Sequence, residues 1–263
     1  MFRYLSLRFP ALLLGLMFCN LASAQIDFDF PKEGVPVLRI DEYYTEAKKD
    51  KRPMLLVFSD GRVLRSVSEN EADDYEFTLS EQKFAQVLKQ IFVVNDFATI
   101  SDEKILDEIS TKRKKRPSRN TFRVTSNTAK GSHVVDFGTT WVYDRLGLGR
   151  KRYPNATELK RFLRVEDACR EIADLALLGG EEAFQFIVKE ARANFSKAYP
   201  DGPKITDTHL YRVRRNSDGD VSIRFLVAKK VVEPHPVSVW VTKVKGNDDL
   251  TIEVKIDAPR GLH

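Results

Sequence analysis

The strongest constraint on the fold is a series of alternating segments near the end of the chain. Between residues 210 and 256, four short segments alternate apolar and polar side chains with a period of two, separated by turn sequences such as Asp218-Gly219. Each segment therefore has one apolar and one polar face. This pattern predicts a four-stranded antiparallel sheet that is covered on one face only.

An amphipathic segment directly before these strands can supply the cover. Residues 181–198 place apolar side chains at helical spacing, and the glycine pair Gly179-Gly180 is suited to end a preceding helix. We therefore place a domain boundary there and predict that residues 179–263 form a helix packed on an antiparallel meander. The polar face of this sheet would carry Arg224, Ser238 and Trp240.

The preceding part, residues 52–178, alternates predicted hairpins and helices. Residues 52–68 and 121–137 each have the pattern of a β-hairpin. After Ser80, a good N-cap, an apolar stripe from Phe84 to Phe92 predicts a helix, and weaker and longer helices are expected over 102–110 and from residue 155 or 157 to 178. The predicted fold class is α+β, with two small domains.

The region in front of this domain, residues 25–51, is expected to be a leader followed by a short helix. Residues 25–33 would form an extended, poorly ordered leader and residues 35–40 a short strand, and Asp41 would cap a short helix that runs through about Lys49. The acidic stretch 69–76, inside the first domain, is expected to be a loop.

Residues 1–24 have the features of a secretory signal peptide. Arg3 and Arg8 accompany an apolar stretch of about 13 residues, and residues 22–24 form a small-x-small cleavage site. The stretch is shorter than the roughly 20 residues that span a bilayer. Cys19 lacks the small preceding residues of a lipoprotein signal. We expect a secreted or periplasmic protein that is not transmembrane after cleavage.

Cysteine usage and charge limit the mature chain further. Cleavage would leave Cys169 as the only thiol, so no internal disulfide can form. The fold must then be stabilised by its hydrophobic core alone. An exported protein without disulfides is more typical of a bacterial envelope than of a eukaryotic secretory route. Glu166 and Asp167 are close to Cys169 and should raise its pKa, which is typical of a buried structural thiol. The chain has 43 Lys and Arg against 38 Asp and Glu; losing two arginines lowers the net charge from +5 to +3.

No motif predicts catalysis, a cofactor or a metal site. The four histidines form no pair on a helix face, and Asp207-Thr208-His209 is interpreted as a polar strand entrance. Redox chemistry of the thioredoxin type needs Cys-x-x-Cys after the first apolar strand, where Ser59-Asp60-Gly61-Arg62 stands. The carboxylates of 69–76 are expected to lie in an open, solvated loop. Catalysis by a carboxylate requires surroundings that shift its pKa, and a solvated loop does not provide them.

The segment 112–123 is the one motif with a functional alternative. It holds seven bases and no acid, and it is either a solvated loop, a partner of the acids in 69–76, or a contact to an anionic polymer or membrane surface. Nucleic acid is not an expected partner. The candidate anion-binding residues are Lys112, Arg113, Lys114, Lys115, Arg116, Arg119 and Arg123.

The helix and four strands of residues 180–257 resemble the layout of cystatin-like folds. Cystatins that inhibit proteases carry a Gln-x-Val-x-Gly hairpin and a Pro-Trp hairpin, whereas the turns here are 216–219 (Asn-Ser-Asp-Gly) and 246–248 (Gly-Asn-Asp). The resemblance therefore implies the layout and not protease inhibition.

Residues 52–175 resemble uncharacterised hairpin-plus-helix domains of exported bacterial proteins, and no activity follows from that resemblance. The residues that carry it are Ser59-Asp60-Gly61-Arg62-Val63, Leu79-Ser80 with Phe84, Asn95-Asp96-Phe97 and Asn120-Thr121-Phe122.

Three functions are compatible with these patterns. The preferred interpretation is an exported, non-enzymatic binding or interaction protein whose sheet faces and loops hold an unknown protein or glycan partner. A second is an enzyme or small-ligand carrier with a site in the C-terminal sheet or between the domains. A third is attachment to an anionic surface through residues 112–123.

Overall fold

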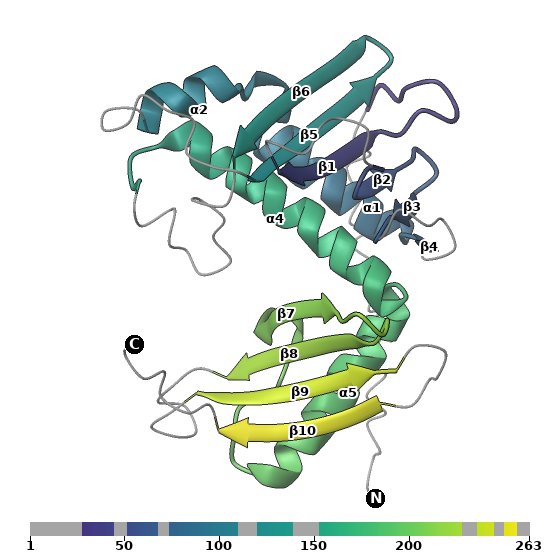
Figure 1. Cartoon of the computed structure of the whole chain (residues 1–263), viewed down its shortest axis with the longest axis vertical. Helices are drawn as coiled ribbons and strands as arrows, with labels where there is room; N and C mark the ends of the chain where they lie inside the picture. Colours follow the sequence, from purple (N-terminus) through teal and green to yellow (C-terminus); the bar gives the residue numbers. More distant parts are fainter. Residues whose placement is uncertain are drawn as a thin grey trace, which may run out of the picture.

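The computed structural model describes residues 28–44, 52–67, 74–109, 120–138, 153–227, 236–244 and 250–256. In these ranges the protein is an α+β structure, as the sequence predicts, and it contains two antiparallel sheets. Figure 1 places the larger sheet at one end of the molecule and the smaller sheet at the other. The predicted signal peptide lies outside the described residues.

The larger sheet has six strands: β1 (Leu38–Tyr44), β2 (Leu55–Val57), β3 (Arg62–Arg65), β4 (Tyr75–Thr78), β5 (Asn120–Thr128) and β6 (Gly131–Gly138). Their order is β4-β3-β2-β1-β5-β6, and all neighbouring pairs are antiparallel. Both predicted hairpins, β2–β3 and β5–β6, are confirmed. The strand β1 lies between these hairpins and joins them into one sheet.

Two expectations about this sheet are wrong. Asp41 lies inside β1 and caps no helix at that point; its carboxylate accepts a hydrogen bond from Arg39 Nε at 3.0 Å. Pairing with β2 and β5 gives hydrogen-bond partners to the backbone N–H and C=O groups along β1, whereas a helix cap satisfies only one or two groups. Glu76, predicted in the acidic loop, lies in β4. Residues 45–51 and 68–73 lie outside the described ranges.

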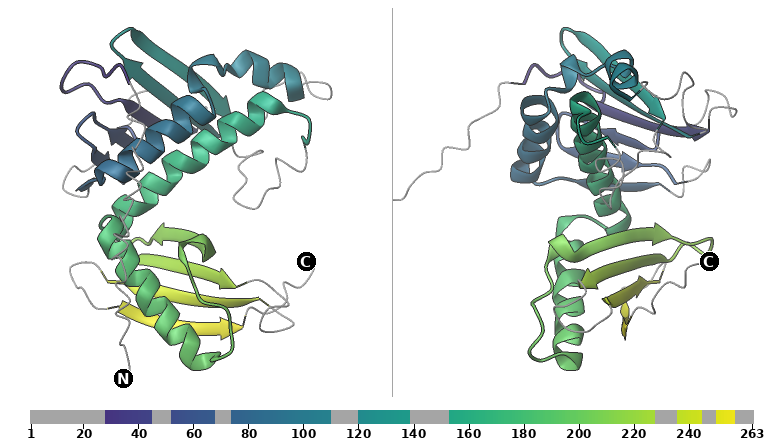
Figure 2. Two further views of the ribbon diagram at one scale, coloured as in Figure 1. Left: turned by 180° about the vertical axis from the view of Figure 1, so that it is seen from behind. Right: turned by 90° about the vertical axis from the view of Figure 1, so that its left-hand side faces the viewer.

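Helices cover one face of the six-stranded sheet, as the side view in Figure 2 shows. The first is α1 (Glu81–Leu88), and the Ser80 hydroxyl accepts from Lys83 N at 3.2 Å, which confirms the predicted cap. It continues as a π-helix, η2 (Lys89–Val94), followed by the short 3-10 turn η3 (Phe97–Thr99) and by α2 (Asp102–Ile109). The long helix α4 (Thr157–Leu178) crosses the same face.

The segment in front of β1 contacts the helices, contrary to the expectation of a loose leader. The ring of Phe28 lies 4.6 Å from that of Phe92, and the ring of Phe30 lies 6.1 Å from that of Phe84. Aromatic pairs at these separations stabilise beyond their buried area. Residues 28–30 therefore dock on α1 and η2.

The glycine pair Gly179 and Gly180 ends α4 and begins α5 (Glu181–Ala198), with φ of 93° and 96°. Residues with a side chain rarely adopt such a positive backbone φ, which explains why both positions are glycine. The 3-10 turn η5 (Asp207–His209) then leads to the smaller sheet, whose order is β10-β9-β8-β7. Its strands are β7 (Leu210–Arg215), β8 (Val221–Val227), β9 (Val237–Lys243) and β10 (Leu250–Ile256).

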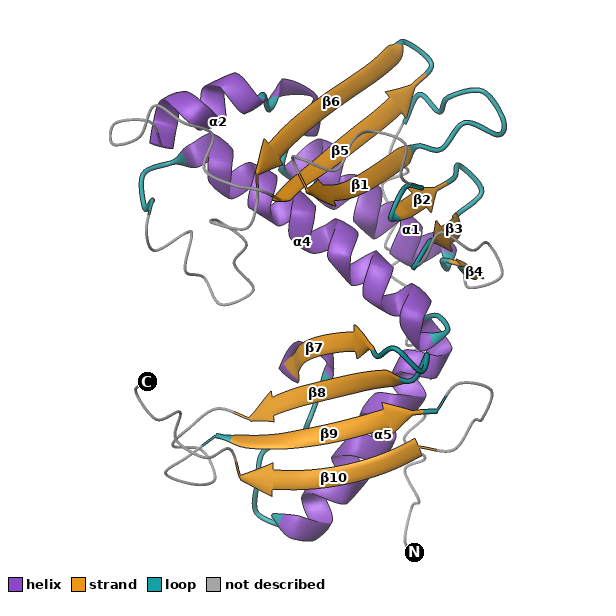
Figure 3. Cartoon of the chain, viewed as in Figure 1, coloured by secondary structure: helices purple, strands orange, loops and turns teal. Residues whose placement is uncertain are grey.

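The smaller sheet buries one face against α5, which confirms the predicted helix on a meander. In β8 every second side chain, from Val221 to Val227, is buried, and the residues between them are partly exposed. Figure 3 shows α5 behind the four strands. The opposite face of these strands therefore points away from α5.

Three contacts connect the two halves at the glycine pair. The Glu181 carboxylate accepts from the backbone N–H of Ser80 at 2.8 Å and from its hydroxyl at 3.0 Å. Lys243 Nζ donates to the carbonyl of Leu178 at 3.2 Å. A Cβ on Gly180 would lie 3.3 Å from the ring of Phe77 in β4, so the chain passes close to the larger sheet here.

Candidate functional site

The face of the smaller sheet that points away from α5 gathers arginines and aromatic rings. Directly paired residues of neighbouring strands share a face, and the register defines two adjacent rows across β7 to β10. One row holds Arg212, Arg224, Trp240 and Glu253; the next holds Arg214, Ser222, Thr242 and Thr251. We call these two rows, with Tyr211 and Ser238, the arginine–aromatic face.

Arg224 lies at the centre of this face and is held by three neighbours. Its guanidinium carbon is 4.9 Å from the ring centroid of Tyr211 and 5.0 Å from that of Trp240, and its Nε donates to the hydroxyl of the buried Ser238 at 2.8 Å. The β7–β8 register shifts between Leu210 and Arg212, which brings Tyr211 beside Arg224. Cation–π contacts and a hydrogen bond thus fix one arginine in place.

The β7–β8 half of this face is strongly cationic. Arg212 and Arg214 are exposed, and Arg212 lies directly opposite Arg224 in the register. The sequences of β7 and β8 contain no acidic residue. Like charges directly opposite each other destabilise a sheet. On β10, Glu253 forms an ion pair with Lys255. Guanidinium groups are suited to carboxylate, sulfate or phosphate, and the hydroxyls and rings around them add hydrogen bonds and apolar contact.

Of the basic residues in 112–123 that are predicted to bind anions, the structure describes one, Arg123. Arg123 lies in β5 and its Nε donates to Asp136 in β6 at 3.1 Å. This cross-strand ion pair already engages the Arg123 guanidinium. The remaining candidates, Lys112, Arg113, Lys114, Lys115, Arg116 and Arg119, lie outside the described residues.

The histidines that the structure describes make local structural contacts. His209 Nδ1 accepts from the backbone N–H of Thr206 at 3.2 Å within a capping box that begins η5. A ring nitrogen of His133 lies 2.9 Å from the carbonyl of Ile100. Across the described ranges, no three His, Cys, Asp or Glu side chains gather as metal ligands would.

A buried charged cluster beneath α4 was not predicted. Glu166 is 1% exposed, and its Oε1 accepts from Arg170 Nε at 2.9 Å. Arg170 also donates to Glu42 of β1 at 3.3 Å, and its guanidinium lies 4.8 Å from the ring centroid of Phe122. Burial raises the pKa of Glu166 to about 7, while the positive charge of Arg170 acts in the opposite direction.

The signal for this buried carboxyl was present in the sequence. Glu166 follows Phe162 by four residues and precedes Cys169 by three, so it lies on the apolar stripe of α4. A carboxylate at such a position must be paired or protonated. Cys169 is fully buried, as predicted; burial, followed by the charge of Glu166, raises its pKa to about 12.

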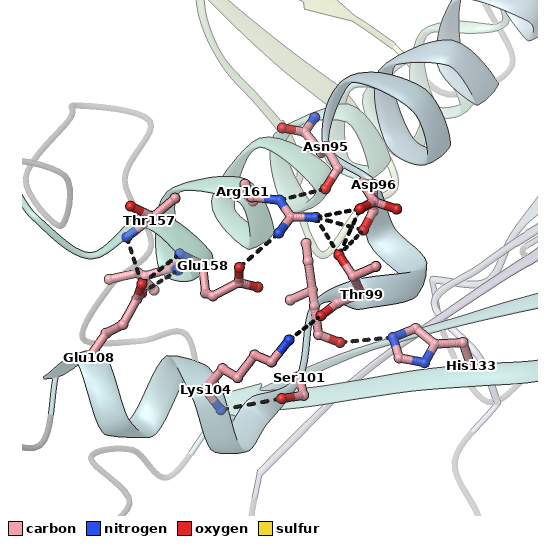
Figure 4. A network of polar contacts seen from close by, with 12 residues as sticks. Asn95, Asp96, Thr99, Ser101, Lys104, Glu108, His133, Thr157, Glu158 and Arg161 are labelled. Atoms are coloured by element: carbon pink, nitrogen blue, oxygen red, sulfur yellow. Dashed lines mark hydrogen bonds and ion pairs between the residues drawn. The ribbon is translucent and has the colours of Figure 1, made fainter.

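A second polar network clamps a loop against the start of α4 (Figure 4). Arg161 donates to the carbonyls of Asn95 and Asp96, both at 2.8 Å, and to the Thr99 hydroxyl at 2.7 Å. Asp96 has φ of 46°, the only positive value at a described non-glycine residue. The clamp therefore holds a strained residue between η2 and η3.

The N-terminus of α4 is capped by a carboxylate from another helix. Both oxygens of Glu108, in α2, accept backbone N–H groups of the first turn of α4, at 2.9 to 3.2 Å. A negative charge at this end is favoured by the helix dipole. Because a protein carboxylate occupies it, this helix end serves α2–α4 packing.

A shallow groove of about 320 Å³ lies between α1 and α4. Lys83 on α1 and Glu171 on α4 both line it and form an ion pair with each other. This pair ties the two walls together. The groove is thus a less favourable candidate than the arginine–aromatic face, where Arg212, Arg214 and Arg224 lie on two strands that contain no acidic residue.

The chain matches no family model, no curated protein and no solved structure. The resemblances to cystatin-like folds and to exported hairpin-plus-helix domains therefore stay predictions. Among the described helices, none has the length and apolar character needed to cross a membrane.

Proposed function

We propose that the protein is an exported, non-enzymatic binding protein that holds a protein or glycan partner on the arginine–aromatic face. One observation carries this proposal: Arg224, fixed between Tyr211 and Trp240, lies beside the exposed Arg212 and Arg214 on strands without acids. A bound anion would be attracted by the two exposed cations, Arg212 and Arg214.

The residue types of the face favour binding over catalysis. Arginine, tyrosine and tryptophan are the residues that most often contribute large binding energies at interfaces. Arginine stays charged at physiological pH and does not act as a general acid or base there. A hydrolytic activity that is lost on a single substitution would contradict the non-enzymatic part of the proposal and favour the enzyme or carrier alternative.

Export and binding are tested separately. The exported protein should begin at Gln25 when its N-terminus is identified by mass spectrometry of the secreted or periplasmic fraction. An uncut chain that stays in the cytoplasm would contradict export.

For binding, the mature protein is applied to immobilised envelope material, and retention is measured against salt. The double variant R212Q/R214Q should elute at distinctly lower salt than the wild type, because two exposed cations are lost. The matched control K189Q/K204Q removes the same charge from two exposed lysines outside the face and should elute with the wild type. Equal elution of all three proteins would refute the proposed face.

A further inference from the structure

We infer that the ligand of the arginine–aromatic face is an acidic glycan, a polysaccharide whose sugar rings carry carboxylate or sulfate groups. This inference rests on the proposed binding function and specifies its ligand. It follows from three features that lie side by side on one face: closely spaced guanidinium groups, an indole ring in the same row, and a row of hydroxyl side chains.

The guanidinium groups have a spacing that suits a chain of anionic groups. Arg212 and Arg224 face each other on adjacent strands, whose backbones lie roughly 4.8 Å apart. Arg212 and Arg214 are two residues apart on one strand, which separates them by roughly 7 Å. The exposed guanidinium groups of Arg212 and Arg214 can each bind a carboxylate or sulfate through two parallel hydrogen bonds. The face thus offers anion contacts along a short path.

Trp240 provides an apolar surface beside these cations. It is the direct partner of Arg224 across β8 and β9, and it is partly exposed. Its ring packs against the guanidinium of Arg224 on one side. The C–H groups on one face of a pyranose ring form a flat apolar patch that packs on an aromatic ring. A sugar ring against Trp240 would lie in the same row as the anion contact of Arg212 and next to the row of Arg214.

The neighbouring row supplies hydrogen bonds of the kind that sugars need. Ser222, Thr242 and Thr251 follow Arg214 across the sheet, one from each successive strand. Each hydroxyl both donates and accepts, as sugar hydroxyl groups do. These side chains are short beside Trp240 and the arginines, so they form the low floor of the face. A ligand rich in hydroxyl groups matches this floor.

Other polyanions fit these features less well. Single-stranded nucleic acid is held by successive bases stacked on successive aromatic faces, whereas Tyr211 and Trp240 both lie against the one guanidinium of Arg224. An acidic peptide would use the arginines but has no saturated ring to pack on Trp240. The three features together favour the glycan.

The test measures affinity and its salt dependence for a panel of polymers: polygalacturonate and chondroitin sulfate as acidic glycans, dextran as a neutral glycan, polyglutamate, and oligothymidine. The mature wild-type chain should bind both acidic glycans and not dextran. R212Q/R214Q should weaken this binding by on the order of tenfold to hundredfold and lower the slope of log affinity against log salt by about two. K189Q/K204Q, the charge-matched control, should keep wild-type affinity.

A pair of Trp240 variants separates a glycan from a simple polyanion. W240L should weaken acidic-glycan binding by about tenfold, as loss of a stacking ring does, while W240F, which keeps a ring, should retain most of it. Circular dichroism checks that each variant is folded. Binding of polyglutamate or oligothymidine as tight as that of the acidic glycans, with no effect of W240L, would overturn the inference while leaving a binding face.

Absence of acidic-glycan binding would also overturn the inference. The envelope-retention assay then decides whether the proposed binding function holds. If R212Q/R214Q still lowers retention there, the face binds a partner of another class; if it does not, the proposed function fails as well.

Discussion

The buried carboxyl of Glu166 makes the stability of this protein depend on pH in an unusual direction. Burial raises its pKa from 4.5 to about 7, so the folded protein holds a proton that the unfolded chain releases. Stability from this group is therefore fully present below pH 4.5 and is lost as the pH rises through 7. Most paired carboxylates act in the opposite sense.

The size of the effect follows from the two pKa values. Each unit of difference between the folded and unfolded pKa corresponds to about 1.4 kcal/mol of stability. The shift from 4.5 to about 7 therefore amounts to about 3 kcal/mol. Glu166 is 1% exposed, so solvent screens this effect little. A typical domain has a total stability of roughly 5–15 kcal/mol, and such a change is measurable.

The variant E166Q isolates this contribution. Glutamine keeps the shape of the side chain and an acceptor for Arg170 Nε, and it does not titrate. Urea denaturation, followed by circular dichroism at pH values from 4.5 to 8, gives the free energy of unfolding of each protein. The wild type should lose about 3 kcal/mol relative to E166Q across this range.

The matched control is E182Q, which replaces an exposed carboxyl on α5. Its stability curve should run parallel to that of the wild type. If the curves of wild type and E166Q also run parallel from pH 4.5 to 8, the carboxyl is not held protonated by burial and the reasoning is refuted.

Three further predictions concern other parts of the molecule. R161M should destabilise the protein by about 2–4 kcal/mol in urea denaturation, because two carbonyls and a hydroxyl lose a charged donor; a loss below 0.5 kcal/mol would contradict the clamp. Cys169 should resist alkylation at pH 8 in the folded protein and react in urea, since burial raises its pKa to about 12; rapid labelling of the native protein would be inconsistent with this. If residues 112–123 attach to anionic surfaces, glutamine at positions 112–115 should lower the salt concentration that elutes the protein from heparin, and unchanged elution would end that idea.

The sequence predicted those elements whose signals are local. The strands β7 to β10 and α5 follow from periodicities of two and 3.6 within single segments, and the Ser80 cap and the glycine pair act within one turn. The order of the larger sheet could not be predicted in this way. β1 is central because of pairing with β2 and β5, and this non-local pairing overrides the helix-start signal of Asp41.

The candidate site was predicted in part. The polar face bearing Arg224, Ser238 and Trp240 followed from strand alternation, and the structure places these three together. Tyr211 was missed because a one-residue register shift in β7 changes which side chains share a face. The pairing of Arg212 with Arg224 was missed for a related reason, since alternation within one strand does not specify register with its neighbour.

The central place of β1 has a consequence for folding kinetics. β1 ends at residue 44, whereas its partner β5 begins at residue 120. One edge of β1 can therefore form its hydrogen bonds only when a distant part of the chain has come to lie beside it. The meander of β7 to β10 pairs only neighbours in sequence, and sheets with local contacts form faster. We therefore expect amide protection in pulsed hydrogen exchange to appear in β8 and β9 before β1. The reverse order would contradict this. Until β5 has been synthesised and pairs with β1, this edge of β1 presents unpaired backbone groups to which another chain can add.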